Sequence, residues 1–122
     1  MNRFETKTNI DQDRAVVKVS GYLSGQAGEA LEEEVGRLLV QGKRSIVIDF
    51  GETQMVNSVG VSILIGVIEK ARESQASLSF SSLTKVNEEI FRLMGLHHHV
   101  PFVDDAAGAE EKAADFTGES RE

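Results

Sequence analysis

The 122-residue chain contains no cysteine and no tryptophan, and it has a single proline. The absence of cysteine excludes disulfide bonds and thiol chemistry and is compatible with a reducing compartment. Hydrophobic residues make up 40% of the chain and charged residues 27%, which is ordinary for a soluble globular protein. A chain of this length can form one domain with a modest core.

The sequence also lacks a basic stripe and a long apolar run. It carries 13 lysines and arginines against 20 aspartates and glutamates, a formal net charge of −7. This balance argues against direct nucleic-acid binding. No apolar run approaches a membrane span, and the first residues lack the basic-then-apolar pattern of a signal peptide. We therefore expect a cytoplasmic protein that binds neither membranes nor nucleic acid directly.

No set of residues with the chemistry of an active site is present. The only histidines are the consecutive His97, His98 and His99, and no glycine-rich phosphate loop precedes a helix. Consecutive side chains are expected to diverge, so a solvated loop is a simpler interpretation of the histidines than a metal site. We expect no enzymatic activity, no metal and no cofactor.

Strand and helix patterns alternate along the chain. Period-two patterns and short apolar runs predict strands over residues 4–10, 15–19, 44–50, 77–83 and 100–103. Helical periodicity and capping residues predict helices over residues 26–40, 58–73, 84–94 and 106–116, the first beginning at Ser24 or Gly25. After a first hairpin, right-handed crossovers give an α/β domain with a mixed sheet of about four to five strands and about four packed helices. This domain is expected to span residues 1–116, with 117–122 as a disordered tail.

Residues 45–64 are the most informative segment. The β-branched run Ile46, Val47 and Ile48 predicts a buried strand that ends at Asp49 and is followed by a short turn. Asn57 and Ser58 are both good helix N-caps. The same position places a hydroxyl at the electropositive end of a helix, where an added phosphate is tolerated. Ser58 is therefore a candidate switch residue, although the plain alternative is a helix cap.

The helix that follows carries two apolar stripes. One stripe is predicted to face the core and comprises Val61, Leu64, Ile65, Ile68 and Ala71. A second lies nearly opposite and comprises Val59, Ile63 and Val67, with Gly66 beside it. Either neighbouring elements cover the second stripe, or it is a docking patch for a partner next to Ser58.

Taken together, these features resemble the STAS domain, the fold of bacterial anti-sigma factor antagonists that also occurs in sulphate-type anion transporters. The resemblance rests on a strand, an acid and a short loop before Asn57-Ser58-Val59-Gly60 and an apolar helix. Two further segments match: residues 19–23 resemble the second strand and its turn, and residues 91–96 resemble the end of the third helix. The resemblance covers about residues 4–115.

The resemblance implies a protein that binds an anti-sigma factor of the serine-kinase type and so releases a sigma factor. Ser58 falls at the phospho-acceptor position, and a serine phosphatase would reverse the modification. Asn57 stands where antagonists usually have Asp, and Ser24 where they often have Asp, so two charges are absent near the kinase interface. The expected partner-binding residues are Ser24, Asn57, Ser58, Val59, Gly60, Ser62, Ile63, Gly66 and Val67. ATP and Mg²⁺ would belong to the kinase, and this chain would be a monomer or weak dimer.

Two other functions remain open at this point. The chain could be a STAS scaffold subunit of a signalling or transport complex that is never phosphorylated. It could also bind a small ligand or a nucleotide, which is the weaker alternative. Native mass determination separates the scaffold from the antagonist, because a scaffold forms large or obligate assemblies.

Overall fold

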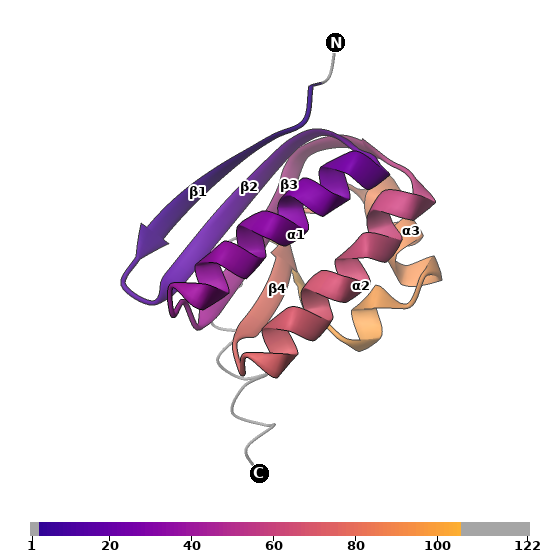
Figure 1. Cartoon of the computed structure of the whole chain (residues 1–122). Helices are drawn as coiled ribbons and strands as arrows, with labels where there is room; N and C mark the ends of the chain where they lie inside the picture. The colour runs from indigo at the N-terminus through magenta and orange to yellow at the C-terminus, as the bar shows by residue number, and fades with distance from the viewer. Residues whose placement is uncertain (1–2, 106–122) are drawn as a thin grey trace.

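The computed structural model describes residues 3–105, which form a five-stranded mixed sheet and three α-helices (Figure 1). The strands are β1 (Glu5–Asp11), β2 (Arg14–Leu23), β3 (Ser45–Val56), β4 (Ser77–Ser81) and β5 (Phe102–Val103). The helices are α1 (Gly25–Val40), α2 (Ser58–Glu73) and α3 (Lys85–Leu93), followed by a 3₁₀ turn, η1 (Leu96–His98). The α/β class and the mixed sheet are confirmed, whereas residues 3–105 contain three α-helices where about four were expected for the domain. The helix expected over residues 106–116 and the tail at 117–122 lie outside the described residues.

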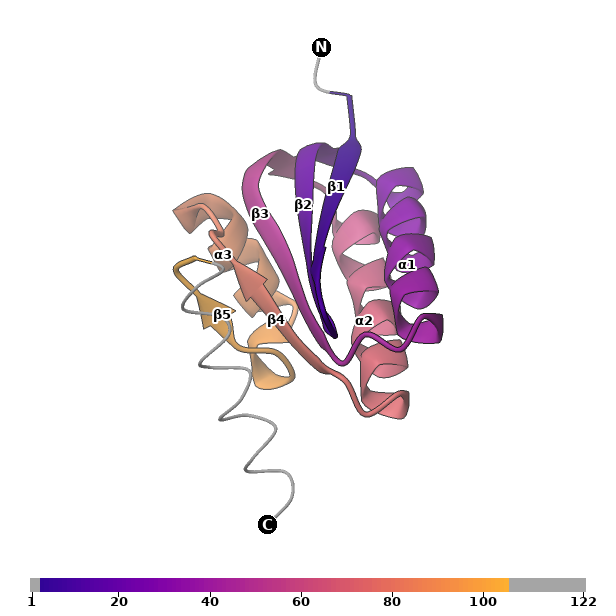
Figure 2. The same ribbon diagram turned by 90° about the vertical axis from the view of Figure 1, so that its left-hand side faces the viewer.

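The sheet follows the order of the chain, β1-β2-β3-β4-β5. The hairpin partners β1 and β2 are antiparallel, and every later neighbour is parallel. Helices α1 and α2 lie side by side on one face of the sheet, on the right in Figure 2. Because β2 and β3 are parallel and each leads into a helix, α1 and α2 begin at the same edge of the sheet.

The core lies between the sheet and its helices. Its largest fully buried side chains include Phe50, Phe80 and Phe91. The Phe91 ring of α3 lies 5.2 Å from that of Phe50 and 5.8 Å from that of Phe80, both edge-on. Edge-to-face aromatic pairs are favourable beyond the area they bury, so this cluster attaches α3 to β3 and β4.

Strands β2 and β3 extend further than the sequence predicts. The chain does not turn after Asp49; β3 continues to Val56, and β2 continues to Leu23. The Asp49 carboxylate accepts a hydrogen bond from the Gly51 N–H at 2.8 Å, close to a register shift in the β2–β3 pairing. The pairing resumes with Ser20 opposite Glu52, shifts again between Gly21 and Tyr22, and ends with Leu23 opposite Val56. A bulge of this kind bends a strand without ending it.

Two helices turn different faces to the core from those predicted. In α2, Val67 is buried in the core in place of Ile65, which was predicted to lie there. Val67 is fully buried, while Ile65 is 40% exposed. The reason is that α2 packs against α1 as well as the sheet, which rotates the buried arc toward α1. In α3 the helical spacing of Val86, Ile90, Leu93 and Met94 predicts a core stripe, but Val86 and Leu93 are exposed, and Asn87 and Phe91 are buried instead.

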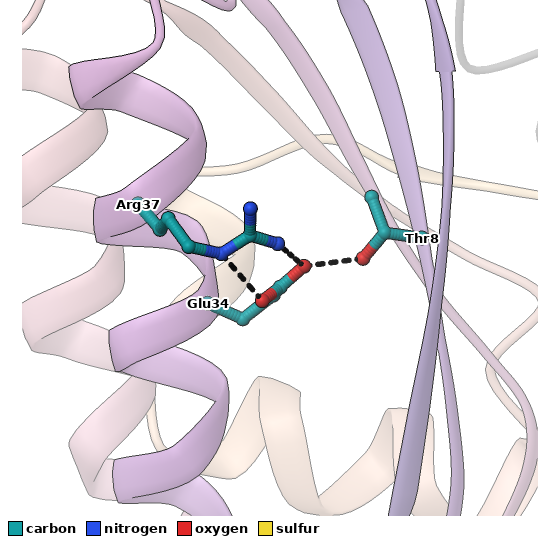
Figure 3. Close-up of polar contacts among 3 residues, drawn as sticks. All are labelled: Thr8, Glu34 and Arg37. Carbon is teal, nitrogen blue, oxygen red and sulfur yellow. Dashed lines mark hydrogen bonds and ion pairs between the residues drawn. The ribbon is translucent and has the colours of Figure 1, made fainter.

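A polar contact ties the edge strand to the first helix (Figure 3). The Thr8 hydroxyl of β1 donates to the Glu34 carboxylate of α1 at 2.6 Å. Arg37, one turn further along α1, donates to both oxygens of the same carboxylate, at 2.6 and 3.2 Å. The hydrogen bonds from Arg37 outweigh partial burial and hold the pKa of Glu34 below its ordinary value. The ionised carboxylate therefore links β1 to α1.

Candidate functional site

The starts of α1 and α2 meet at the carboxyl ends of β2 and β3. Ser24 caps α1, and its hydroxyl oxygen accepts a hydrogen bond from the Ala27 N–H at 3.2 Å. Asn57 caps α2, and its backbone N–H donates to the Leu23 carbonyl at 3.1 Å. The two helix starts are thus joined through the chain segment that precedes each of them. Their free N–H groups and positive dipole ends point to the same edge of the sheet.

Both ends of the Asn57 side-chain amide are engaged. Its Oδ1 accepts from the Gly60 N–H at 2.8 Å, which is the capping bond of α2. Its Nδ2 donates to the Tyr22 hydroxyl oxygen at 2.9 Å. Asn57 therefore performs the capping role that the sequence assigned to either Asn57 or Ser58.

The Ser58 side chain is not used as the helix cap. Ser58 is the first residue of α2 and is exposed, and its hydroxyl makes no hydrogen bond within residues 3–105. No acidic side chain occupies the first turn of α2. A group attached to this hydroxyl would meet solvent on one side and a helix N-terminus on the other.

Gly60 allows α2 to approach the segment before α1. A Cβ at this buried position would collide with the Leu23 carbonyl and lie 2.7 Å from the Ser24 carbonyl oxygen. Gly28 of α1 plays the reciprocal part, since a Cβ there would lie 3.1 Å from the Gly60 carbonyl oxygen. The two glycines fix the spacing of the helix starts, so Gly60 positions Ser58 from inside the fold.

The packing of α2 against α1 leaves some residues of the predicted docking stripe exposed and buries others. Val59 is 57% exposed and Ser62 is also exposed, whereas Val67 is fully buried and unavailable to a partner. Ile63 is half-buried, because its side chain packs over Gly28 of α1. Gly66 is half-buried beside the Glu32 carboxylate of α1. The exposed stripe runs instead from Ser58 through Ser62 to Ile65, at positions i, i+4 and i+7.

Two exposed residues that sequence reasoning missed lie near the ends of the strands that lead into α1 and α2. Tyr22 and Met55 are neighbours across β2 and β3, and Met55 is 60% exposed. Tyr22 contacts Asn57 through its hydroxyl. Tyr22 and Met55 were missed because the strands were predicted to end before them. The apolar residues Leu23 and Val56, which are buried and partly buried in the structure, indicate that both strands continue. Tyr22 and Met55 near the ends of β2 and β3 and Val59 and Ile65 on α2 are exposed apolar residues, and together with Ser58 we call them the Ser58 surface.

The histidine cluster does not form a metal site in the part of the chain that the structure describes. No group of three or more histidine, cysteine, aspartate or glutamate side chains there could hold a metal ion. The expected divergence of consecutive rings is wrong for His97 and His98, whose centroids lie 4.0 Å apart. Burial, with smaller effects from His98 and Arg92, lowers the pKa of His97. Across residues 3–105, none of the helices has the length and apolar character needed to cross a membrane.

Comparison with known proteins places the chain in a family. A family model described as "Mlab, STAS domain" matches residues 6–104, so the chain belongs to the STAS domain family. Among curated relatives, BtrV of Bordetella bronchiseptica, a candidate anti-sigma factor antagonist, is 26% identical over 98 residues, 79% of this chain and 84% of BtrV. The anti-sigma-F factor antagonist RsfB of Mycobacterium tuberculosis is 29% identical over 82 residues, 67% of this chain and 66% of RsfB.

Solved structures agree with the fold. An anti-sigma factor antagonist from Mycobacterium paratuberculosis superposes with a TM-score of 0.80 at 22% identity, covering 92% of this chain and 95% of that one. The antagonist SpoIIAA in its unphosphorylated form superposes with a TM-score of 0.65 at 19% identity, covering 93% and 96%. The Bacillus SpoIIAA in its phosphorylated form superposes with a TM-score of 0.66 at 19% identity, covering 93% and 97%.

Proposed function

We propose that this protein is an anti-sigma factor antagonist whose binding is switched by phosphorylation of Ser58. The observation that carries the proposal is the free Ser58 hydroxyl at the start of α2, with capping assigned to Asn57. Membership of the STAS family and the names of the relatives support the partner class. The protein acts as a cytoplasmic binding module, and catalysis belongs to its partner.

In the unphosphorylated state the protein docks onto an anti-sigma factor of the serine-kinase type through the Ser58 surface. Val59 and Ile65 supply apolar contacts on α2, and Met55 extends them onto β3. Exposed apolar side chains grouped around one polar residue are typical of a protein-docking surface. Docking occupies the anti-sigma factor and releases the sigma factor for transcription.

Phosphorylation acts at the interface rather than on the fold. Phosphate adds a charge of about −1.5 to −2 at pH 7. Within this chain the α2 N-terminus tolerates that charge. In the complex the charge must lose water beside Val59 and the partner's apolar atoms, which is costly. A loss of about 2.7 kcal/mol weakens binding roughly 100-fold, so no large conformational change is needed.

The two departures from the usual family pattern are compatible with this function. Asn57 keeps the capping bond to Gly60 that an aspartate would make, and it brings no charge next to the phosphate. Ser24 likewise retains the cap of α1. Both exchanges therefore alter the charge that the kinase meets while leaving the helix starts intact.

The test begins with capture of the partner from the native host on immobilised Ser58→Ala protein, which cannot be released by phosphorylation. The account predicts capture of a protein with an ATP-binding serine-kinase domain. That partner, given ATP and Mg²⁺, should place one phosphate on the wild-type chain at Ser58, as located by mass spectrometry. Ser74→Ala is the matched control, because it removes a hydroxyl at the opposite end of α2 and should leave modification unchanged. Phosphate on Ser62 or no phosphate at all would contradict the proposal.

A further inference from the structure

The hydrogen-bond direction between Asn57 and Tyr22 is fixed by the fold. A backbone N–H can only donate, so the Asn57 atom facing the Gly60 N–H must be Oδ1. The Nδ2 group therefore faces Tyr22 and donates to the phenol oxygen at 2.9 Å. As the acceptor in this bond, the Tyr22 hydroxyl keeps its own hydrogen for another partner.

That hydrogen has no acceptor in residues 3–105. The Tyr22 side chain makes a single hydrogen bond within the described part of the chain, the one received from Asn57. The residue is 37% exposed, and its bond to Asn57 places its hydroxyl beside the residue that precedes Ser58. A phenol with a free donor, bonded to the residue that precedes an exposed serine, can serve an anionic group attached to that serine.

We propose that Tyr22 is a specificity-determining residue for the phosphorylated state, donating its free hydrogen to the phosphate on Ser58. This inference rests on the proposed function, because it concerns the same serine. Hydrogen bonding to the charged form favours that form, so Tyr22 favours the fully ionised phosphate. Asn57 makes this role available by acting as the donor to Tyr22.

An aspartate at position 57 would reverse the arrangement. A carboxylate can accept from the Gly60 N–H with one oxygen and from the Tyr22 hydroxyl with the other. The phenol hydrogen would then be used within the protein, and a second negative charge would stand beside the phosphate. The effect of Tyr22 on the phosphate thus depends on the residue at position 57, and this dependence distinguishes a direct role from a merely structural one.

The experiment uses the full chain with phosphoserine incorporated at position 58 during translation, so that no kinase is required. The second acid dissociation of the phosphate is followed by ³¹P NMR in four proteins: wild type, Tyr22→Phe, Asn57→Asp and the double variant. With Asn57 in place, Tyr22→Phe should raise the phosphate pKa, which means that the acid dissociation constant falls about threefold. In the Asn57→Asp background the same exchange should have little effect.

The control is Ser74→Ala, which removes a hydroxyl at the opposite end of α2 and should leave the phosphate titration unchanged. Equal melting temperatures would establish that the four proteins are equally folded. No effect of Tyr22→Phe with Asn57, or an equal effect in both backgrounds, would overturn the proposal. Because phosphoserine is introduced without a partner, this outcome is independent of whether a kinase modifies Ser58, which tests the proposed function separately.

Discussion

Gly60 lies so close to Ser24 that a Cβ at position 60 would be only 2.7 Å from the Ser24 carbonyl oxygen. The Ser24 oxygen belongs to the backbone, and the position of a Cβ is fixed by its own backbone, so neither atom can turn aside as the end of a side chain can. Gly60→Ala should therefore force the starts of α1 and α2 apart and reduce the free energy of unfolding by at least about 2 kcal/mol. Urea unfolding followed by circular dichroism measures the loss.

Gly36 supplies the matched control for that exchange. It also lies inside a helix, but a Cβ there would meet only the Lys70 ammonium group at the end of a flexible side chain, at 3.7 Å. Gly36→Ala should leave stability unchanged or raise it by up to about 1 kcal/mol, because alanine favours the helix. Equal losses in both variants, or no loss in Gly60→Ala, would contradict the close-approach account of position 60.

The second prediction separates the core of α2 from its exposed side. Leu64 is fully buried, so Leu64→Asp places an unpaired charge in the core and should cost more than about 4 kcal/mol, enough to unfold a marginal domain. Val59→Asp adds the same charge at an exposed position in the first turn, where the helix dipole favours it. It should melt like wild type and lose its partner. Thermal melts and partner binding together check both halves, and a folded Leu64→Asp protein would refute the assigned core face.

The third prediction concerns acid stability. The folded pKa of Glu34 is held below its ordinary value of 4.5, chiefly by hydrogen bonds from Arg37. A depressed carboxylate pKa contributes stability above the unfolded pKa, and the contribution is lost as the pH falls through the folded pKa. Glu34→Gln should cost about 0.5 to 1 kcal/mol at pH 7, and its difference from wild type should shrink below about pH 4.5.

Glu33→Gln is the control for the acid experiment. Glu33 is exposed on the same helix and makes no hydrogen bond or ion pair within residues 3–105. Its difference from wild type should stay near zero across the pH range. A pH dependence shared by both variants would assign the effect to net charge instead of to the Thr8–Glu34–Arg37 contact.

The order of the elements could be predicted from the sequence because it depends on local patterns. The β-branched run Ile46–Ile48 and the apolar spacing of α2 each fix one element without reference to the rest of the fold. The position of Ser58 followed from capping chemistry, which is also local. Right-handed crossovers then led to the mixed sheet.

The features that could not be predicted depend on distant contacts. Residues 51–55 are mostly exposed and carry little strand pattern, and they form part of β3 only because β2 pairs with them past the register shift. Likewise, a helical wheel assumes one covered side, whereas α1 also covers Val67 and leaves Ile65 exposed. The Tyr22–Asn57 contact joins residues 35 positions apart and has no local signal.

The affinity of Ser58 variants for the captured anti-sigma factor tests the central claim most directly. Calorimetry should find Ser58→Ala within about threefold of wild type, since the Ser58 surface is intact and Asn57 keeps the cap. Ser58→Glu should bind at least about tenfold more weakly, and less weakly than phosphoserine, because a carboxylate carries less charge. It should also melt no lower than wild type, since a negative charge in the first turn is favourable. Wild-type affinity in the Ser58→Glu protein would contradict the account.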